Sequence, residues 1–270
     1  MNKLGFTLLH FYMRTLSVVA PQKAAKKALD MFFMPKKHPS KTWETDALKS
    51  AKSITLEGGI NCLVWGEGKP ILLMHGWEGR ASQMAVFLPY LSSQYQLIAL
   101  NAPAHGLSDG IRSHPHKFVK AIFAAQQHFG DFHAIVGHSM GGGTAVYATL
   151  ANLNVNKVIS IAGPSDFENL VRAFALFIDL RGNALNMFLQ KAEEEVELPF
   201  STLNLASRVA NLDKPLLVIH DEDDLEVPFT GASRYKHTIA HGEFYATKGL
   251  GHRKIMQSPE VLQKVADFIG

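Results

Sequence analysis

The sequence predicts an α/β fold, a mostly parallel, doubly wound sheet with helices on both faces, and three observations point to it. Short continuous apolar runs such as 70–74 and 97–100 are typical of strands that are buried on both faces of a parallel sheet. From Ser53 onward such runs alternate with segments of helical spacing. The run 134–136 leads into Gly-x-Ser-x-Gly at 137–141 and then into a helical segment, the strand, turn and helix of a nucleophile elbow.

Before this core, residues 1–52 are predicted to form a helical extension and a linker. The segments 4–19 and 22–34 have helical spacing, and a proline ends each of them because proline cannot continue a helix. The polar stretch 36–52 is predicted as the linker. We expect the two helices to pack against the body of the protein.

Charge is concentrated in the same region. Residues 1–41 hold eight basic residues and one acidic residue, which leaves the rest of the chain at −4 because the whole carries +3. An alternative to packing is therefore a weak contact with a membrane surface through the basic helices. Arg14 interrupts the apolar stretch before the roughly 20 residues that a membrane span needs. Lysines without a recognition motif do not indicate nucleic-acid binding.

Composition is that of an ordinary globular enzyme, with 47% hydrophobic and 19% charged residues. The single cysteine, Cys62, can form no internal disulfide, which favours a reducing compartment. We expect a cytoplasmic protein, peripheral to a membrane if the basic helices bind one. The chain has no zinc, dinucleotide or phosphate-loop motif, so we expect no metal and no cofactor. Nothing in the sequence predicts the oligomeric state.

The predicted core covers 53–164 and 212–270. A hairpin at Gly58-Gly59 joins two strands, and the remaining elements alternate along the chain. The expected strands are 53–56, 61–65, 70–74, 97–100, 134–136, 158–161, 216–219 and 243–246, and the expected helices are 82–91, 118–129, 144–148 and 260–268.

Residues 165–211 break this alternation and are predicted to form a small helical cap inserted above the sheet. The segment contains no convincing strand, but 167–180 and 184–196 have helical spacing. Most of its aromatic side chains suit the cap's own core, and one or two of them suit a substrate pocket. The candidates for that pocket are Trp77, Phe174, Phe177, Met187 and Phe188.

Three kinds of residue needed for nucleophilic catalysis follow predicted strands. A serine hydroxyl such as that of Ser139 is a weak nucleophile until a base takes its proton and an acid orients the base. His252 follows the last predicted strand, at the sheet edge where Ser139 is expected. The stretch 221–224 follows another buried strand and offers four carboxylates in a row.

With the order serine, acid, histidine, the chain from Ser53 onward resembles the α/β-hydrolase superfamily. The loop at 75–79, His-Gly-Trp-Glu-Gly, resembles the family's oxyanion loop, and 224–228 fits its Asp-x-x-Val-Pro acid loop. The turn at 101–108 resembles Asp-x-x-Gly-His-Gly-x-Ser, with Asn101 and Ala104 in place of aspartate and glycine.

This resemblance implies a catalytic triad of Ser139, Asp224 and His252. Asp223 is the near alternative for the acid, and Asp166 is a second alternative because some relatives carry the acid after the preceding strand. The backbone N–H groups of Trp77 and Met140 are the implied oxyanion hole. Three further histidines, His75, His105 and His138, are interpreted as stabilising turns.

The implied activity is hydrolysis of carboxylic esters of short to medium acyl chain through an acyl-enzyme, with a small-molecule ester and water as partners. Alternatives on the same triad are a thioesterase, a lysophospholipase or lipase, and a carbon–carbon bond hydrolase. A binding protein that has kept the fold without catalysis is a further alternative of a different class.

Overall fold

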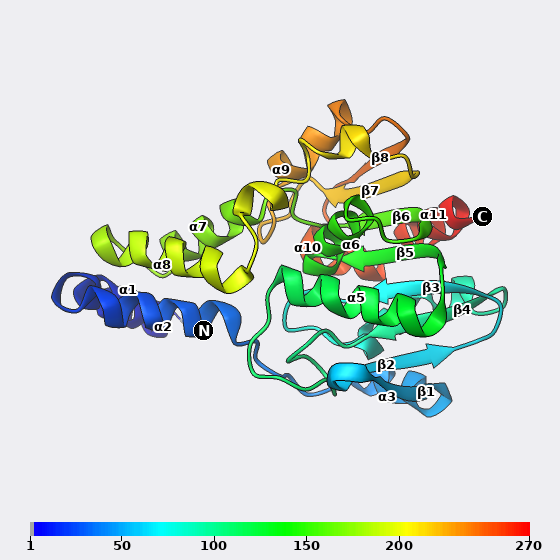
Figure 1. Ribbon diagram of the computed structural model, residues 1–270, viewed down its shortest axis with the longest axis horizontal. Helices are drawn as coiled ribbons and strands as arrows, with labels where there is room; N and C mark the ends of the chain where they lie inside the picture. The colour runs from blue at the N-terminus through cyan, green and yellow to red at the C-terminus, as the bar shows by residue number, and fades with distance from the viewer. Residues whose placement is uncertain (1–2) are drawn as a thin grey trace.

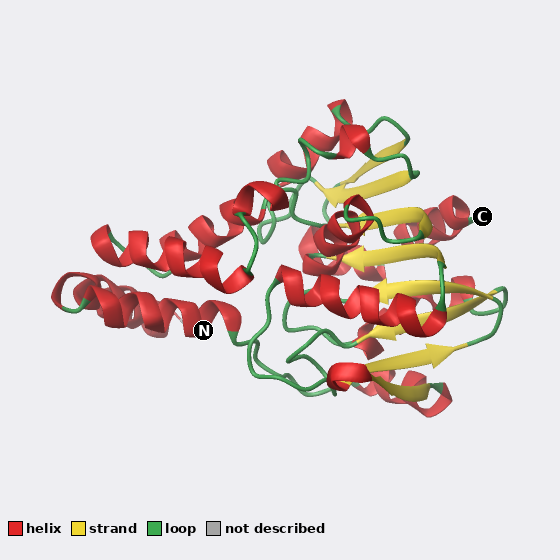
Figure 2. Cartoon of the chain, viewed as in Figure 1, coloured by secondary structure: helices red, strands yellow, loops and turns green. Residues whose placement is uncertain are grey.

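One eight-stranded sheet forms the centre of the molecule (Figures 1 and 2). In this computed structural model, which describes residues 3–270, the strand order is β1-β2-β4-β3-β5-β6-β7-β8. Only β1–β2 and β2–β4 pair antiparallel, and every other neighbouring pair is parallel, which confirms the predicted α/β class. The strands are β1 (Lys52–Leu56), β2 (Ile60–Trp65), β3 (Lys69–Met74), β4 (Tyr95–Leu100), β5 (Phe132–His138), β6 (Val155–Ile161), β7 (Leu216–Asp221) and β8 (Gly242–Thr247).

Helices cover both faces of the sheet because the side chains of its central strands alternate between two apolar layers. Leu72 and Ile135 belong to the layer under α5 and α6, whereas Ile71 and Leu73 belong to the layer under α11. The helices are α1 (Lys3–Val19), α2 (Pro21–Phe33), α3 (Thr42–Ser50), α4 (Leu88–Leu91), α5 (Pro115–Phe129), α6 (Met140–Leu150), α7 (Phe167–Phe177), α8 (Gly182–Val196), α9 (Phe229–Ser233), α10 (Gly251–Lys254) and α11 (Pro259–Ile269).

The segment between β6 and β7 contains α7 and α8, and these helices pack with α1 and α2 into a helical lobe (Figure 1). The lobe extends beyond the carboxyl ends of the parallel strands. Its interior is aromatic: the ring of Phe32 lies 4.9 Å from that of Phe174 and 6.1 Å from that of Phe188. The N-terminal helices thus share one core with the inserted helices, although about 150 residues separate the two segments in the sequence.

Arg112 fastens this lobe to the sheet domain. Its guanidinium lies 2.5 Å from a carboxylate oxygen of Asp30 on α2 and 2.6 Å from one of Glu195 on α8. The same group lies over the ring of Phe33, 5.9 Å from its centroid. One side chain from the loop before α5 therefore holds both halves of the lobe.

Two stretches differ from their predicted secondary structure. The predicted linker contains a helix, α3. Its Glu44 is buried against the sheet domain in an ion pair with Arg80, and this distant partner cannot be recognised from the local sequence. The predicted helix 82–91 is instead a 3-10 helix, η2 (Ala81–Phe87), followed by the short α4. Pro89 explains the break, because it has no N–H to continue an α-helical ladder.

No described helix combines the length and the apolar character that crossing a membrane requires.

The ion pair that positions α3 generates a stability prediction. Glu44 is fully buried and receives two bonds from the Arg80 guanidinium, of 2.6 and 2.9 Å, and one from the Ser82 hydroxyl. Burial opposes its ionisation, but these hydrogen bonds and one from the Lys41 amide outweigh burial and hold the pKa of Glu44 below its usual value. Glu44→Gln leaves Arg80 without its counter-charge, and we expect a loss of about 3 kcal/mol in the free energy of unfolding.

Urea unfolding of both this variant and Glu57→Gln measures that loss. Glu57 is exposed, so we expect its substitution to change the free energy by no more than about 0.5 kcal/mol. Equal stability of the two variants would contradict a structural role for the Glu44–Arg80 pair.

Candidate active site

Ser139 stands alone between β5 and α6 in a strained turn. Its backbone has φ 54° and ψ −123°, a combination that non-glycine residues rarely adopt. The turn requires glycines on both sides: a Cβ at Gly137 would lie 2.1 Å from the Gly141 carbonyl oxygen, and one at Gly141 would lie 2.4 Å from that of Met74. The Ser139 amide donates to the Ile161 carbonyl at 2.8 Å, which ties the turn to β6.

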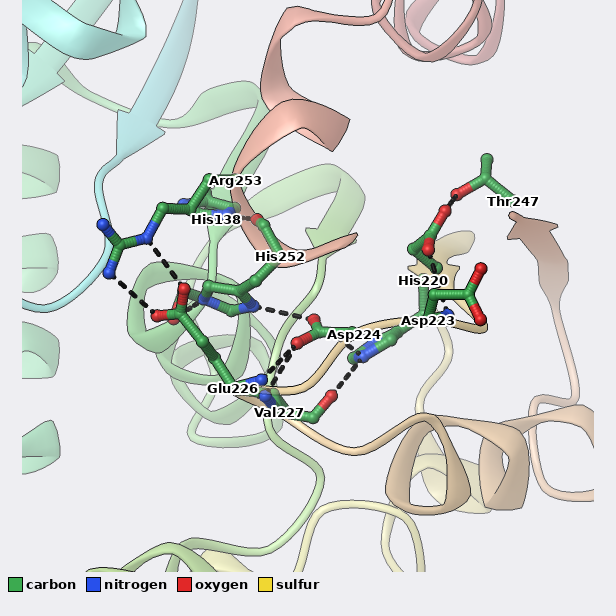
Figure 3. A network of polar contacts seen from close by, with 11 residues as sticks. His138, His220, Asp223, Asp224, Glu226, Val227, Thr247, His252 and Arg253 are labelled. Carbon is green, nitrogen blue, oxygen red and sulfur yellow. Dashed lines mark hydrogen bonds and ion pairs between the residues drawn. The ribbon is translucent and has the colours of Figure 1, made fainter. Parts of the chain in front are cut away.

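The structure brings together the three residues predicted as a triad (Figure 3 shows His252 and Asp224). Ser139 Oγ lies 2.9 Å from His252 Nε2, and His252 Nδ1 lies 2.7 Å from Asp224 Oδ2. His252 lies on α10 after β8, and Asp224 lies after β7, so neighbouring strands deliver both side chains to one edge of the sheet. Because the Asp224 carboxylate only accepts, Nδ1 carries the proton and Nε2 is free to accept the hydroxyl proton of Ser139.

Asp224 is held as an anion by its own loop. Its Oδ1 accepts the Glu226 amide at 2.9 Å and the Val227 amide at 2.8 Å. Burial favours the neutral acid, but hydrogen bonds from His220, His252 and the Val227 amide outweigh burial and hold the pKa of Asp224 well below its usual range.

His220 is a neighbour of Asp224 that the sequence did not single out. It is fully buried, with Nε2 at 2.8 Å from the Val227 carbonyl oxygen and 3.3 Å from Asp224 Oδ2. Its place at the end of β7, four residues before the acid, is the only sequence signal that it gives. His220 therefore helps to fix the loop on which Asp224 lies.

Neither alternative acid contacts His252 in the described structure. Asp223 is exposed and accepts the Gly249 amide at 3.1 Å. Asp166 caps α7, where its carboxylate accepts the Asn169 amide. The buried carboxylate of Asp221 accepts the Thr247 hydroxyl and the Leu250 amide, so it orders the loop that carries His252.

Two further contacts fix the backbone around His252 (Figure 3). His138 Nε2 donates to the His252 carbonyl at 2.9 Å, and burial lowers the pKa of His138 to about 4, which keeps its ring neutral. Arg253 pairs with Glu226 at 2.7 Å and so links α10 to the acid loop. The histidine and its acid are thus tied together through their neighbours as well as directly.

The loop 75–79 runs beside Ser139. A Cβ at Gly76 would lie 2.9 Å from the Ser139 Cβ, so this glycine permits the close approach. His75 accepts the Ala102 amide at Nε2 and donates from Nδ1 to the Gly76 carbonyl oxygen. The Trp77 ring packs on that of His105, with centroids 5.1 Å apart.

Helix α6 begins directly after the nucleophile. Met140 is its first residue, and the first N–H groups of a helix have no intrahelical acceptor. The positive end of this helix therefore faces the turn that carries Ser139.

An apolar crevice opens next to Met140. Residues of α6 and of the inserted segment form its walls, which are Pro115, Met140, Gly143, Thr144, Tyr147, Pro164, Phe167, Leu203 and Leu205. A larger cavity of about 220 Å³ lies between the segment 36–40 and the loops at 78–82 and 105–107. Neither Ser139 nor His252 lines this cavity. Ser139 and His252 do not line the crevice either, but Met140, the residue after the nucleophile, does, which makes the crevice the better candidate for a substrate site.

The predicted pocket residues of the inserted segment lie in the lobe instead. Phe188 is fully buried in the aromatic core, where it cannot line an open pocket, and Phe174 and Met187 pack against the same core. Phe177 is 54% exposed and contacts the ring of Phe6 on α1. Helical spacing does not reveal which partner a face meets, and here the partner is the N-terminal pair of helices.

Several known proteins are similar to this chain in sequence or in fold. Residues 69–197 match a family model described as the alpha/beta hydrolase fold. A serine hydrolase-like protein of Danio rerio is 27% identical over 126 residues, covering 42% of this chain and 37% of that protein. Serine hydrolase-like protein 2 of Homo sapiens is 29% identical over 169 residues, covering 56% and 51%. The match thus spans about half of these two relatives or less.

An ester-cleaving relative and two solved structures add to this comparison. The pimeloyl-[acyl-carrier protein] methyl ester esterase of Legionella pneumophila is 26% identical over 158 residues, covering 56% of this chain and 63% of that protein. The Pyrococcus furiosus esterase Pf2001 superposes with a TM-score of 0.64 at 19% identity, over 87% of this chain and 98% of that one. A membrane phospholipase A, described as a bacterial virulence factor, gives 0.64 at 17% identity, over 98% and 96%. These two structures share the fold.

The buried histidines around the site generate a prediction for stability against pH. Burial is the main cause that lowers the pKa of His75 to about 3 and that of His105 to about 4. Below about pH 6.5 these histidines are therefore protonated in the unfolded chain, whereas in the folded chain they stay neutral down to about pH 4. We expect the free energy of unfolding to fall as the pH falls through this window, by up to about 1.4 kcal/mol per pH unit for each histidine.

Urea unfolding between pH 7 and pH 4 measures this slope. His105→Asn should reduce it by about one proton, whereas His128→Asn, on the exposed side of α5, should leave it as in the wild type. A slope that does not change in His105→Asn would show that this histidine takes up its proton in the folded chain.

Proposed function

We propose that this chain, which belongs to the α/β-hydrolase superfamily, is a serine hydrolase that cleaves carboxylic esters of short to medium acyl chain. The observation that carries the proposal is the continuous hydrogen-bonded series from Ser139 Oγ through His252 to Asp224, at 2.9 and 2.7 Å. A serine so placed is activated by an adjacent base, and the base is oriented by a buried carboxylate.

In the first step Ser139 Oγ attacks the acyl carbonyl carbon while His252 Nε2 takes the hydroxyl proton. Asp224 keeps the proton of His252 on Nδ1 and stabilises the imidazolium that forms. The ester C–O bond then breaks, and His252 gives its proton to the departing alkoxide, which leaves as an alcohol. The product of this step is an acyl-enzyme on Ser139.

The second step repeats the chemistry with water. His252 takes a proton from water, the hydroxide attacks the acyl carbon, and Ser139 recovers its proton as the acid leaves. We assign the Met140 and Trp77 amides to the developing oxyanion. The free N–H at the start of α6 and the approach of Gly76 to Ser139 support this assignment.

The preference for an acyl chain of modest length rests on the crevice beside Met140. Apolar side chains from α6 and the inserted segment form its walls, and they include Phe167 and Leu203. We infer that the acyl group lies there, in contact with Met140. The similarity to esterases is consistent with this substrate class.

Hydrolysis of p-nitrophenyl esters from acetate to palmitate, by the wild type and by Ser139→Ala, tests the proposal. We expect activity on the shorter esters and a decrease in turnover of about 10⁴- to 10⁶-fold in the variant. A serine-directed fluorophosphonate should label the wild type and not the variant. A chain that neither turns over any ester nor is labelled is a binding protein and not a hydrolase.

The identity of the acid has its own test in two neighbouring carboxylates. Asp224→Asn gives His252 Nδ1 a partner that can donate as well as accept, so the wrong tautomer forms, and we expect kcat to fall by about 10⁴-fold. Asp223→Asn changes an exposed carboxylate that accepts the Gly249 amide, and we expect kcat within about threefold of the wild type. The reverse order of effects in steady-state kinetics would assign the acid to Asp223.

A further inference from the structure

Helix α1 is apolar on two opposite sides. One side packs into the lobe through Met13, which is fully buried, and through the half-buried Leu9 and Leu16. The other side, here called the outer face of α1, is exposed to solvent at 50 to 79% of each side chain. It consists of Leu4, Leu8, Phe11, Tyr12, Val18 and Val19.

The spacing places these side chains along one side of the helix, where Thr15 is the polar residue among them. Leu4, Leu8 and Phe11 are separated by one turn each, and Val18 follows two turns later on the same side. A surface helix normally has one apolar side, so a second, exposed apolar side of this length marks an interaction surface.

Cations flank the stripe. Arg14 is exposed on α1, and Lys23, Lys26 and Lys27 are exposed on the adjoining α2. Within the part of the chain that the structure describes, these three lysines form no ion pair, because Asp30, the acid of α2, is paired with Arg112. An apolar stripe with free lysines beside it is complementary to the boundary between acyl chains and anionic headgroups.

The acidic residues of the lobe have partners within the lobe or beside it. Asp179 pairs with Arg181, Glu168 pairs with Arg172, and Glu195 shares Arg112 with Asp30. Two exposed carboxylates of α8 accept amides instead, Glu193 from Phe200 and Glu194 from Gln190. The lysines of α2 remain available to a ligand outside the chain.

Contacts along its inner side keep α1 flat against the lobe. His10 Nε2 donates to the Phe177 carbonyl at 2.6 Å, and Ser17 Oγ accepts the Arg181 amide at 3.3 Å. We propose that the outer face of α1 docks this protein onto the surface of an anionic phospholipid bilayer. The helix lies in the interface, its stripe among the upper acyl carbons and the lysines of α2 at the phosphates.

Two features favour a lipid surface over a second copy of the chain. The lysines lie beside the stripe and would face like charges in a symmetric pair, which is unfavourable. Tyr12 suits the headgroup level, where the amphipathic rings of tyrosine and tryptophan accumulate, and Phe11 suits the acyl side of that level. The proposal does not depend on the hydrolase activity, because binding is measured without turnover.

Flotation of the full chain with vesicles tests it. We expect the wild type to float with vesicles of phosphatidylcholine and phosphatidylglycerol at about 3:1, and to bind about tenfold more weakly to phosphatidylcholine alone. The triple variant Leu8→Gln, Phe11→Gln, Val18→Gln should lose about tenfold or more of the binding. A matched triple, Leu8→Met, Phe11→Leu, Val18→Ile, keeps the stripe apolar and should bind as the wild type does.

The charges are tested in the same way. Lys23→Gln, Lys26→Gln, Lys27→Gln should bind both kinds of vesicle equally, because the preference for the anionic lipid is lost. Lys49→Gln, Lys52→Gln, Lys69→Gln removes three exposed lysines from the sheet domain and should leave that preference unchanged.

Each contrary outcome overturns the proposal. Circular dichroism and p-nitrophenyl ester turnover on every variant separate loss of binding from loss of folding. Wild type that floats with neither vesicle, or a glutamine triple that floats like the wild type, shows that the stripe binds no lipid. Sedimentation that finds a dimer in the wild type and a monomer in the glutamine triple, with no flotation, assigns the stripe to a second copy.

Discussion

The backbone of Ser139 is the constraint on which the site depends. A positive φ at a serine costs on the order of 1–3 kcal/mol, and the fold maintains it by giving the turn no room to relax. A Cβ at Gly137 would collide with the Gly141 carbonyl, and one at Gly141 would collide with the Met74 carbonyl. Gly76, in the loop after β3, lies close to the Ser139 side chain. The turn follows β5, a central strand of the sheet, and holds Ser139 Oγ 2.9 Å from His252 Nε2.

Neighbouring carboxylates of the acid loop have different hydrogen-bond partners and therefore different roles. Asp221 and Asp224 are both buried anions, and backbone amides with side-chain donors lower the pKa of each. Asp221 Oδ2 accepts the Thr247 hydroxyl at the end of β8 and the Leu250 amide in the loop before His252, whereas Asp224 Oδ2 lies against His252 itself. Asp223 lies outside and retains a single amide partner. These three carboxylates thus differ because the loop directs each one to different partners.

The sequence predicted correctly those features that depend on residues close together in the chain. The buried strands, the turn at Ser139 and the position of His252 each follow from a few adjacent residues. Helix α3 did not, because its burial depends on Arg80, 36 residues away from Glu44. The packing of Phe188 was equally hidden: its helical spacing shows an apolar face, but only the fold reveals that α2 covers it. Long-range partners, and not propensity, account for the differences.

The lobe shows how such partners tie the extension to the site. Helix α7 begins at Phe167, which lines the crevice beside Met140, and ends at Phe177, which meets α1. One rigid helix, about 16 Å long, thus joins the crevice wall to the N-terminal helices. Arg112, from the sheet domain, forms ion pairs with both α2 and α8 and so links the two halves of the lobe. The inner side of α1 packs within this lobe through Met13, whereas the outer face of α1 is exposed to solvent in the described chain.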